Sequence, residues 1–247
     1  MKIKQHLPSI FTLINLFLGF LAIINTMAGD YVIACYIILA AGAFDSVDGK
    51  IARLIGISTN FGKEIDSLAD MVSFCLAPSI LVYSLYTQNM PGISGELIAS
   101  APLIMGAIRL ARFNTDITSE NPAYFTGLPT PMNALSIASL VLFIEYFKID
   151  NPEYSQPRLL LPLILSLSYL MVSRVHYAKF PIINFNSGKQ NSLRLLGVAF
   201  FAVTFIGAIF IGYPYRVLAG FVSFYLLTGI WNHLKNLGNV ESKNQES

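Results

Sequence analysis

The chain has 247 residues, of which 54% are hydrophobic and only 12% are charged, and its formal net charge is +2. Soluble domains carry roughly 25% charged residues, so a water-soluble fold of this chain would leave much apolar surface exposed. The composition therefore excludes an ordinary soluble domain and predicts an all-α integral membrane protein. The lipid bilayer is its expected surrounding, and we expect no nucleic-acid partner.

Several apolar stretches approach or exceed the roughly 18–20 residues that cross hydrocarbon as a helix. About eight spans are predicted, at residues 9–29, 31–54, 65–87, 96–113, 131–147, 159–176, 193–212 and 214–234. The first span follows Lys2 and Lys4 and could be a secretion signal. Its length, and the polar residues Thr12 and Asn15 inside it, favour a retained helix.

Basic residues predict the orientation, because Lys and Arg concentrate on the cytoplasmic side of membrane proteins. With a cytoplasmic N-terminus and eight spans, thirteen of the 16 basic residues lie inside, and only Lys148, Arg158 and Arg216 lie outside. We therefore expect both termini in the cytoplasm, in a multi-pass protein of the cell membrane.

Four aspartates at the facing ends of the second and third spans are the strongest functional signal. Asp45 and Asp48 share one helical face, and Asp66 and Asp70 share another, since residues three or four apart are neighbours on a helix. Small residues accompany them at Gly49, Ala52 and Gly62. The short segment 54–61 can fold the two helices back, so the acidic faces are expected to meet near the cytoplasmic side.

Carboxylates at bilayer depth are costly and mark functional sites by default. Four of them facing one another require protons or hard cations between them, and oxygen ligands suit Mg²⁺, Mn²⁺ or Ca²⁺. Two bridged ions would polarise a phosphate ester for in-line displacement. Two alternatives remain: acids solvated at helix ends, and a divalent-cation transporter whose carboxylates line a pathway.

The hairpin reads Asp45-x2-Asp48-Gly49-x2-Ala52-Arg53-x8-Gly62-x3-Asp66-x3-Asp70, with eight fixed positions over 26 residues. It resembles the signature of the CDP-alcohol phosphatidyltransferases. That resemblance implies a membrane enzyme with a six-helix core that displaces CMP from a CDP-linked lipid, using two divalent metal ions (Mg²⁺ or Mn²⁺). It also implies that the four aspartates are the metal ligands and that Asp70 is the general base.

The resemblance extends to the binding of the CDP-lipid. Pro8-x3-Thr12-x2-Asn15 is similar to the entry helix that contacts the nucleotide in this family, with Ser9 in place of the usual asparagine. The residues expected to bind the CDP-lipid are Thr12, Asn15, Gly49, Ala52, Arg53, Thr59 and Gly62. The expected divisions are 1–180 for the six-span core, 181–234 for a C-terminal transmembrane hairpin of the same domain, and 235–247 for a polar cytoplasmic tail.

Motifs further along the chain concern the acceptor alcohol. Arg109-Leu110-Ala111-Arg112-Phe113-Asn114, the run from Phe125 to Pro131, and Leu170-Met171-Val172-Ser173 resemble the serine-accepting branch of the family. CDP-diacylglycerol and L-serine are thus the expected substrates, phosphatidylserine and CMP the products, and a homodimer the expected assembly. Glycerol 3-phosphate or inositol phosphate remain as other acceptors.

The expected serine-binding residues are Arg109, Arg112 and Asn114. Serine carries a carboxylate, so its site needs an inward-facing cation, and the two arginines lie three apart on one helix face. The alternative is that both arginines anchor the helix at lipid headgroups.

Overall fold

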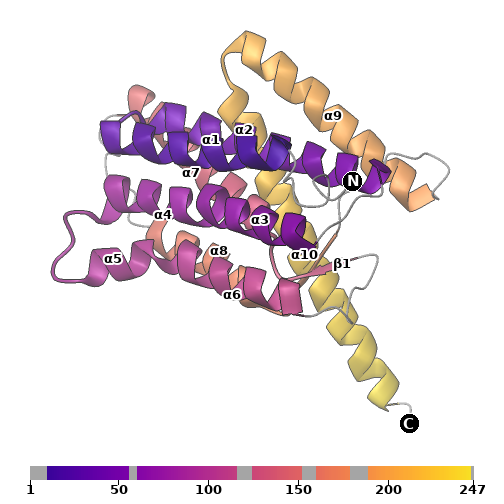
Figure 1. The fold of residues 1–247 in the computed structure, drawn as a ribbon. Coiled ribbons are helices and arrows are strands. Elements are labelled where there is room, and N and C mark those ends of the chain that lie inside the picture. Colours follow the sequence, from indigo (N-terminus) through magenta and orange to yellow (C-terminus); the bar gives the residue numbers. More distant parts are fainter. Residues whose placement is uncertain (1–9, 56–59, 116–123, 152–159, 179–188, 246–247) are drawn as a thin grey trace. The chain divides into compact units, whose positions relative to one another are not determined.

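The computed structural model describes residues 10–55, 60–115, 124–151, 160–178 and 189–245, and these are almost entirely helical (Figure 1). The predicted all-α membrane architecture is confirmed. The elements are α1 (Ile10–Ala28), α2 (Tyr31–Ile55), α3 (Asn60–Asp70), the π-helical η2 (Met71–Leu76), α4 (Ala77–Val82), the π-helical η3 (Tyr83–Thr87), α5 (Ser94–Ala99), α6 (Ala101–Thr115), β1 (Tyr124–Thr126), α7 (Thr130–Asp150), α8 (Leu160–Val172), β2 (His176–Ala178), α9 (Lys189–Ile211) and α10 (Pro214–Gln245).

Within the described ranges, five helical segments are long and apolar enough to cross a membrane. They are Ile10–Ala28, Phe61–Thr87, Ser94–Thr115, Thr130–Ile149 and Asn191–Ile211. Two shorter apolar helices are Tyr31–Val47 and Leu160–Val172. Helix α2 ends at Ile55, next to the predicted limit at 54, whereas α8 ends at Val172, before the predicted limit at 176. Helix α10 continues through the expected polar tail as far as Gln245.

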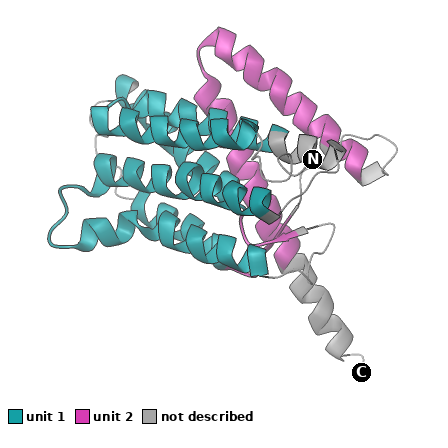
Figure 2. Cartoon of the chain, in the orientation of Figure 1, with its two compact units in different colours: residues 1–119, 129–172 teal, residues 120–128, 173–247 magenta. Residues whose placement is uncertain are grey.

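The chain forms two compact units (Figure 2). Unit 1 comprises residues 1–119 and 129–172, and unit 2 comprises residues 120–128 and 173–247. Unit 1 contains all of the acidic hairpin. The short segment 120–128, which includes β1, belongs with the C-terminal part of the chain rather than with its sequence neighbours.

Small residues allow the first two helices of unit 1 to pack closely. Ala22 on α1 and Ala34 and Ala41 on α2 have no exposed surface, and close backbone approach of this kind drives helix association in lipid. Phe17 and Phe20, on the other side of α1, are more than half exposed. An apolar surface turned outward is what a lipid-facing helix requires.

A glycine reverses the chain between α1 and α2. Gly29 has a φ of 87°, a left-handed conformation that favours glycine. Its N–H donates to the carbonyl of Thr26, and the N–H of Asp30 donates to the carbonyl of Asn25 at 2.9 Å. This pair of bonds is a Schellman motif, which satisfies the last carbonyls of α1. The tight reversal returns α2 along α1 toward the acidic end.

Unit 2 is held together around Tyr177, which is fully buried. Its strand β2 pairs antiparallel with β1, with Phe125 opposite Tyr177. The Tyr177 ring stacks on Tyr225 of α10 at a centroid distance of 5.6 Å and covers Gly229, where a Cβ would collide with the ring. Burial raises the pKa of Tyr177 to about 12, so its hydroxyl stays protonated. The Tyr177 ring therefore packs the strand pair against α10, beside a second ring contact between His176 of β2 and His233 of α10.

Candidate active site

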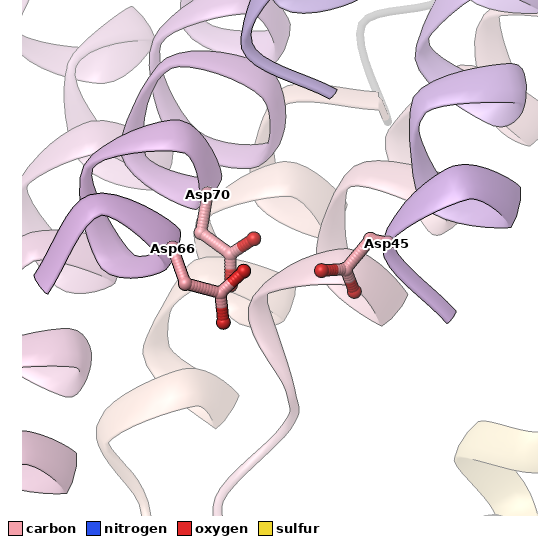
Figure 3. Close-up of side chains that lie close together, drawn as sticks. All are labelled: Asp45, Asp66 and Asp70. Carbon is pink, nitrogen blue, oxygen red and sulfur yellow. The ribbon is translucent and has the colours of Figure 1, made fainter. Parts of the chain in front are cut away.

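Three of the four predicted aspartates converge in unit 1. Asp45 of α2 meets Asp66 and Asp70 of α3, and one carboxylate oxygen from each lies within 4.8 Å of the others. Figure 3 shows the three side chains directed toward one shared space. All three are partly buried. Two consecutive helices thus present their acids to a single point, as the spacing of the acids predicted.

The local sequence accounts for this geometry. Asp66 and Asp70 are one helical turn apart, so both project from the same face of α3. Gly62, one turn earlier on this face, is partly buried. Helix α1 packs against both α2 and α3 and brings the two acidic segments into one bundle. The cluster is a product of helical periodicity and of the packing around α1.

The donor set fits hard divalent cations. Three carboxylates at this separation repel one another, and a cation between their oxygens would remove that repulsion. Oxygen ligands are the type that Mg²⁺ and Mn²⁺ prefer. The described part of the cluster contains no thiolate or imidazole ligand, which distinguishes it from a typical zinc site.

Asn15, a polar residue of the first helix, contacts the same cluster. Thr12 and Asn15 belong to the buried face of α1, and Asn15 has no exposed surface. The Asn15 Nδ2 donates to Asp70 Oδ1 at 3.5 Å. The structure therefore places Asn15 of the first-span motif in contact with Asp70 of the acidic cluster.

Arg109 and Arg112 of α6 contact the end of α8. Arg109 Nη1 donates to the carbonyl of Met171 at 3.4 Å, and Arg112 Nη1 donates to the carbonyl of Val172 at 3.2 Å. Cations at a helix C-terminus satisfy its last carbonyls and stabilise its dipole. Arg109 also lies within electrostatic range of Asp70. The two arginines thus connect α6 to α8 beside the cluster.

Asn114, the third expected serine ligand, is bonded to α3. Its Nδ2 donates to Ser67 Oγ at 3.1 Å, and the Ser67 hydroxyl is 3.3 Å from Asn114 Oδ1. Because Ser67 directly follows Asp66, this contact fixes the end of α6 beside a cluster carboxylate. A role for Asn114 in holding serine stays a prediction.

Several expected site residues lie outside what the structure describes. Asp48, Gly49, Ala52 and Arg53 are in the last turns of α2, where the helix is described but the side-chain surroundings are not, and Thr59 lies outside the described residues altogether. Their assigned roles therefore stay predictions.

Two serines of the third span were not expected at the site. Ser67 bonds to Asn114, and the Ser73 hydroxyl donates to the backbone carbonyl of Asn15 at 2.8 Å. A signal for Ser73 was available in the sequence, since it lies one turn after Asp70 while Gly19 lies one turn after Asn15. A serine and a glycine in such positions on neighbouring membrane helices favour close contact.

Comparisons with known proteins agree with the site. Residues 5–179 match the family model of the CDP-alcohol phosphatidyltransferases. A CDP-diacylglycerol–serine O-phosphatidyltransferase of Helicobacter pylori is 34% identical over 223 residues, which cover 90% of this chain and 89% of that protein. The Bacillus subtilis protein of the same name is 34% identical over 190 residues, 76% of this chain and 99% of that protein.

An archaeal relative has a related name. The archaetidylserine synthase of Methanothermobacter thermautotrophicus is 33% identical over 177 residues, 70% of each chain. The family model covers well over half of the sequence, including the whole acidic hairpin and the first-span motif. The chain belongs to the CDP-alcohol phosphatidyltransferases and is a membrane enzyme of the transferase class.

Proposed function

We propose that this enzyme transfers the phosphatidyl group of CDP-diacylglycerol to the hydroxyl of L-serine, giving phosphatidylserine and CMP. The observation that carries the proposal is the convergence of Asp45, Asp66 and Asp70 within 4.8 Å, in a chain of this family. The serine acceptor is supported by the names of the bacterial and archaeal relatives and by the motifs around Arg109 and Phe125.

We infer that Asp45, Asp66 and Asp70, together with Asp48, hold two divalent ions, Mg²⁺ or Mn²⁺. The described carboxylates suit this role by ligand type and by mutual distance. When bound, such ions polarise the phosphate oxygens of the CDP-lipid and neutralise charge that develops on the leaving group. The same residues without cations would repel both one another and the diphosphate.

Asp70 is the proposed general base. It takes the proton of the serine hydroxyl while the serine oxygen attacks the lipid-linked phosphorus, and the bond from that phosphorus to the oxygen of CMP breaks. General-base help of this kind contributes typically about 10²–10⁴-fold in rate. The Asn15 amide donates to Asp70 and keeps its carboxylate directed into the site. No covalent enzyme intermediate is required.

The remaining predicted residues bind the substrates. For the CDP-lipid these are Thr12, Asn15, Gly49, Ala52, Arg53, Thr59 and Gly62, with the Arg53 guanidinium placed to fork onto phosphate oxygens. Arg109, Arg112 and Asn114 are the proposed ligands of serine. A guanidinium has five N–H donors, so a bond to one backbone carbonyl is compatible with a second ligand.

The enzyme is proposed to work at the cytoplasmic face of the cell membrane. The diacylglycerol chains then remain in the inner leaflet while serine arrives from the cytoplasm, on the side given by the basic residues. In this proposal the chain has a six-span core at 1–180, a transmembrane hairpin at 181–234 and a cytoplasmic tail at 235–247. The enzyme is proposed to be a homodimer.

The test is CMP release by the purified protein from CDP-diacylglycerol, with L-serine, glycerol 3-phosphate, inositol phosphate or no acceptor. We expect release to depend on serine and on added Mg²⁺ or Mn²⁺, and to stop in excess chelator. Asp45→Asn should be inactive, while Asp30→Asn, which removes an exposed carboxylate at the start of α2, should be active. Release with another acceptor alone would reassign the substrate, and full activity in chelator would exclude the metal ions.

The same preparation tests the transporter alternative. Reconstituted into vesicles, a transporter would move Mn²⁺ across the membrane without substrate, and the acidic cluster would be needed for that uptake. We expect no uptake above that of protein-free vesicles. Uptake without any CMP release would replace the enzymatic proposal.

A further inference from the structure

The buried Ser73 forms a hydrogen bond with Asn15, the residue whose side chain contacts the proposed base Asp70. Ser73 lies in η2, one turn beyond Asp70, and has no exposed surface. Its hydroxyl donates to the Asn15 backbone carbonyl at 2.8 Å, while the Asn15 side chain donates to Asp70. Asn15 is therefore held at its backbone by one residue of the third span and contacts another with its amide.

A glycine makes this contact possible. In an α-helix the carbonyl of residue 15 points toward residue 19, and Gly19 has no side chain to cover it. A Cβ at Gly19 would collide with the Ser73 side chain and with its Cα. Small residues that let one helix backbone approach another are the usual means of helix association in lipid. Gly19 and Ser73 thus form a matched pair.

The π-helical segment gives Ser73 its position. Residues Met71–Leu76 of η2 follow Asp70 directly, and Pro78 comes shortly after. Proline removes a backbone donor from its helix, and π-helical turns accommodate such interruptions, often near functional sites. The serine that contacts α1 therefore sits in an irregular turn immediately after the acid.

We propose that Ser73 is a positioning residue for phosphatidyl transfer, which fixes the Asn15 amide against Asp70 by bonding the Asn15 carbonyl at the glycine gap of α1. The inference rests on the proposed function of Asp70. Ser73 itself touches no substrate; it acts through Asn15. Its loss should lower kcat with little change in the KM for serine, because the acceptor site is not part of this contact.

The test compares Ser73→Ala with Ser168→Ala. Ser168 is also fully buried, and its hydroxyl donates at 2.8 Å to a carbonyl of its own helix, Ile164. Both substitutions remove one buried hydroxyl and leave the same small void. Because Ser73→Ala removes a hydrogen bond that aligns the Asn15 amide with Asp70, we expect kcat to fall roughly five- to tenfold. For Ser168→Ala we expect a fall of less than about twofold. Equal kcat values for the two variants would overturn the proposal.

A double-mutant cycle separates positioning from general damage. If Ser73 acts through the Asn15 amide, Ser73→Ala should cause no further loss of kcat in an Asn15→Ala background. Multiplicative losses would show that Ser73 acts independently of Asn15 and would contradict the proposal. Gly19→Ala provides a second route, since it keeps the hydroxyl but displaces it, and should lower kcat at least as much as Ser73→Ala.

A readout without turnover completes the design. Binding of Mn²⁺ to the substrate-free protein, measured by electron paramagnetic resonance, should weaken severalfold in Ser73→Ala and stay unchanged in Ser168→Ala, because only the former loosens a cluster carboxylate. An active Asp70→Asn variant would refute the proposed role of Asp70. If Asp70→Asn is inactive but Ser73→Ala has the same kcat and Mn²⁺ affinity as Ser168→Ala, only the positioning role of Ser73 is refuted.

Discussion

Replacement of Asp45 by asparagine should make the metal-free protein more stable while abolishing its activity. The asparagine keeps the shape of the side chain and removes one of three mutually repelling charges. In a structural ion-pair network the same change would destabilise the protein. The sign of the stability change therefore shows whether the Asp45 carboxylate stabilises the metal-free fold or destabilises it, as expected for a ligand-binding site.

The magnitude follows from the geometry. Two unit charges 4.8 Å apart repel by about 3.5 kcal/mol at an effective dielectric constant of about 20. The carboxylates are only partly buried and one can take up a proton, so we discount the gain to about 1–2 kcal/mol. One kcal/mol moves the unfolding midpoint of a protein this size by roughly 2–4 °C, which gives an increase of about 2–8 °C.

Divalent metal should reverse the order of stability. A ligand at a hundred times its dissociation constant stabilises the native state by about 2.7 kcal/mol. Wild-type protein should gain most of this in Mn²⁺, and Asp45→Asn should gain little because it lacks one ligand. The variant is then the more stable protein in chelator and the less stable one in metal.

The assay is thermal unfolding in detergent, followed by intrinsic fluorescence, in excess chelator and in millimolar Mn²⁺. Asp30→Asn is the control, since Asp30 is exposed and its carbonyl accepts the N–H of Ala34 at the start of α2. Asparagine caps a helix as well as aspartate does, so this control should move little in either condition. A lower midpoint of Asp45→Asn in chelator would refute the reasoning, because the carboxylate would then be stabilising the metal-free fold.

Three further outcomes are expected. Asp70→Asn should lower kcat at least about 10²-fold with wild-type expression and folding, and near-normal turnover would remove Asp70 as the base. Arg109→Ala should raise the KM for serine more than that for CDP-diacylglycerol, and unchanged serine kinetics would leave it only its contact with α8. Gly229→Ala should lower the unfolding midpoint, because overpacking costs typically about 1–3 kcal/mol where a Cβ meets the Tyr177 ring. Tyr177→Phe is the matched control, since the buried Tyr177 hydroxyl has no hydrogen-bond partner among the described residues, and a midpoint equal to that of Gly229→Ala would contradict the packing explanation.

The acidic cluster was accessible from the sequence because it depends on local rules. A spacing of three or four residues fixes which acids share a helical face, and a short connection between two spans makes those faces antiparallel neighbours. The meeting of Asp45 with Asp66 and Asp70 follows from these two facts.

The partners of the cluster were harder to predict because they depend on how helices cross. The contact of Ser73 with Asn15 needs an irregular turn after Asp70, and such a turn shifts the phase of every later residue relative to a 3.6-residue period. The bonds from Arg109 and Arg112 to α8 need the end of a helix some sixty residues away in sequence. The charge pattern suggested a ligand for these arginines but could not identify a helix terminus.

Close approach between helices resolves a difficulty that the acidic cluster creates. In lipid, apolar side chains gain little by leaving the solvent, so helices with facing like charges must be held by packing and by interhelical hydrogen bonds. Hydrogen bonds of this kind lie near the acids. Ser73 bonds to α1, Asn114 bonds to α3, and Arg112 bonds to α8. At Gly106 a Cβ would collide with the Cys75 side chain, so η2 and α6 are also in close contact. The bundle can therefore keep its carboxylates within ligand distance without a cation, so a cation that binds there would not have to bring the acids together.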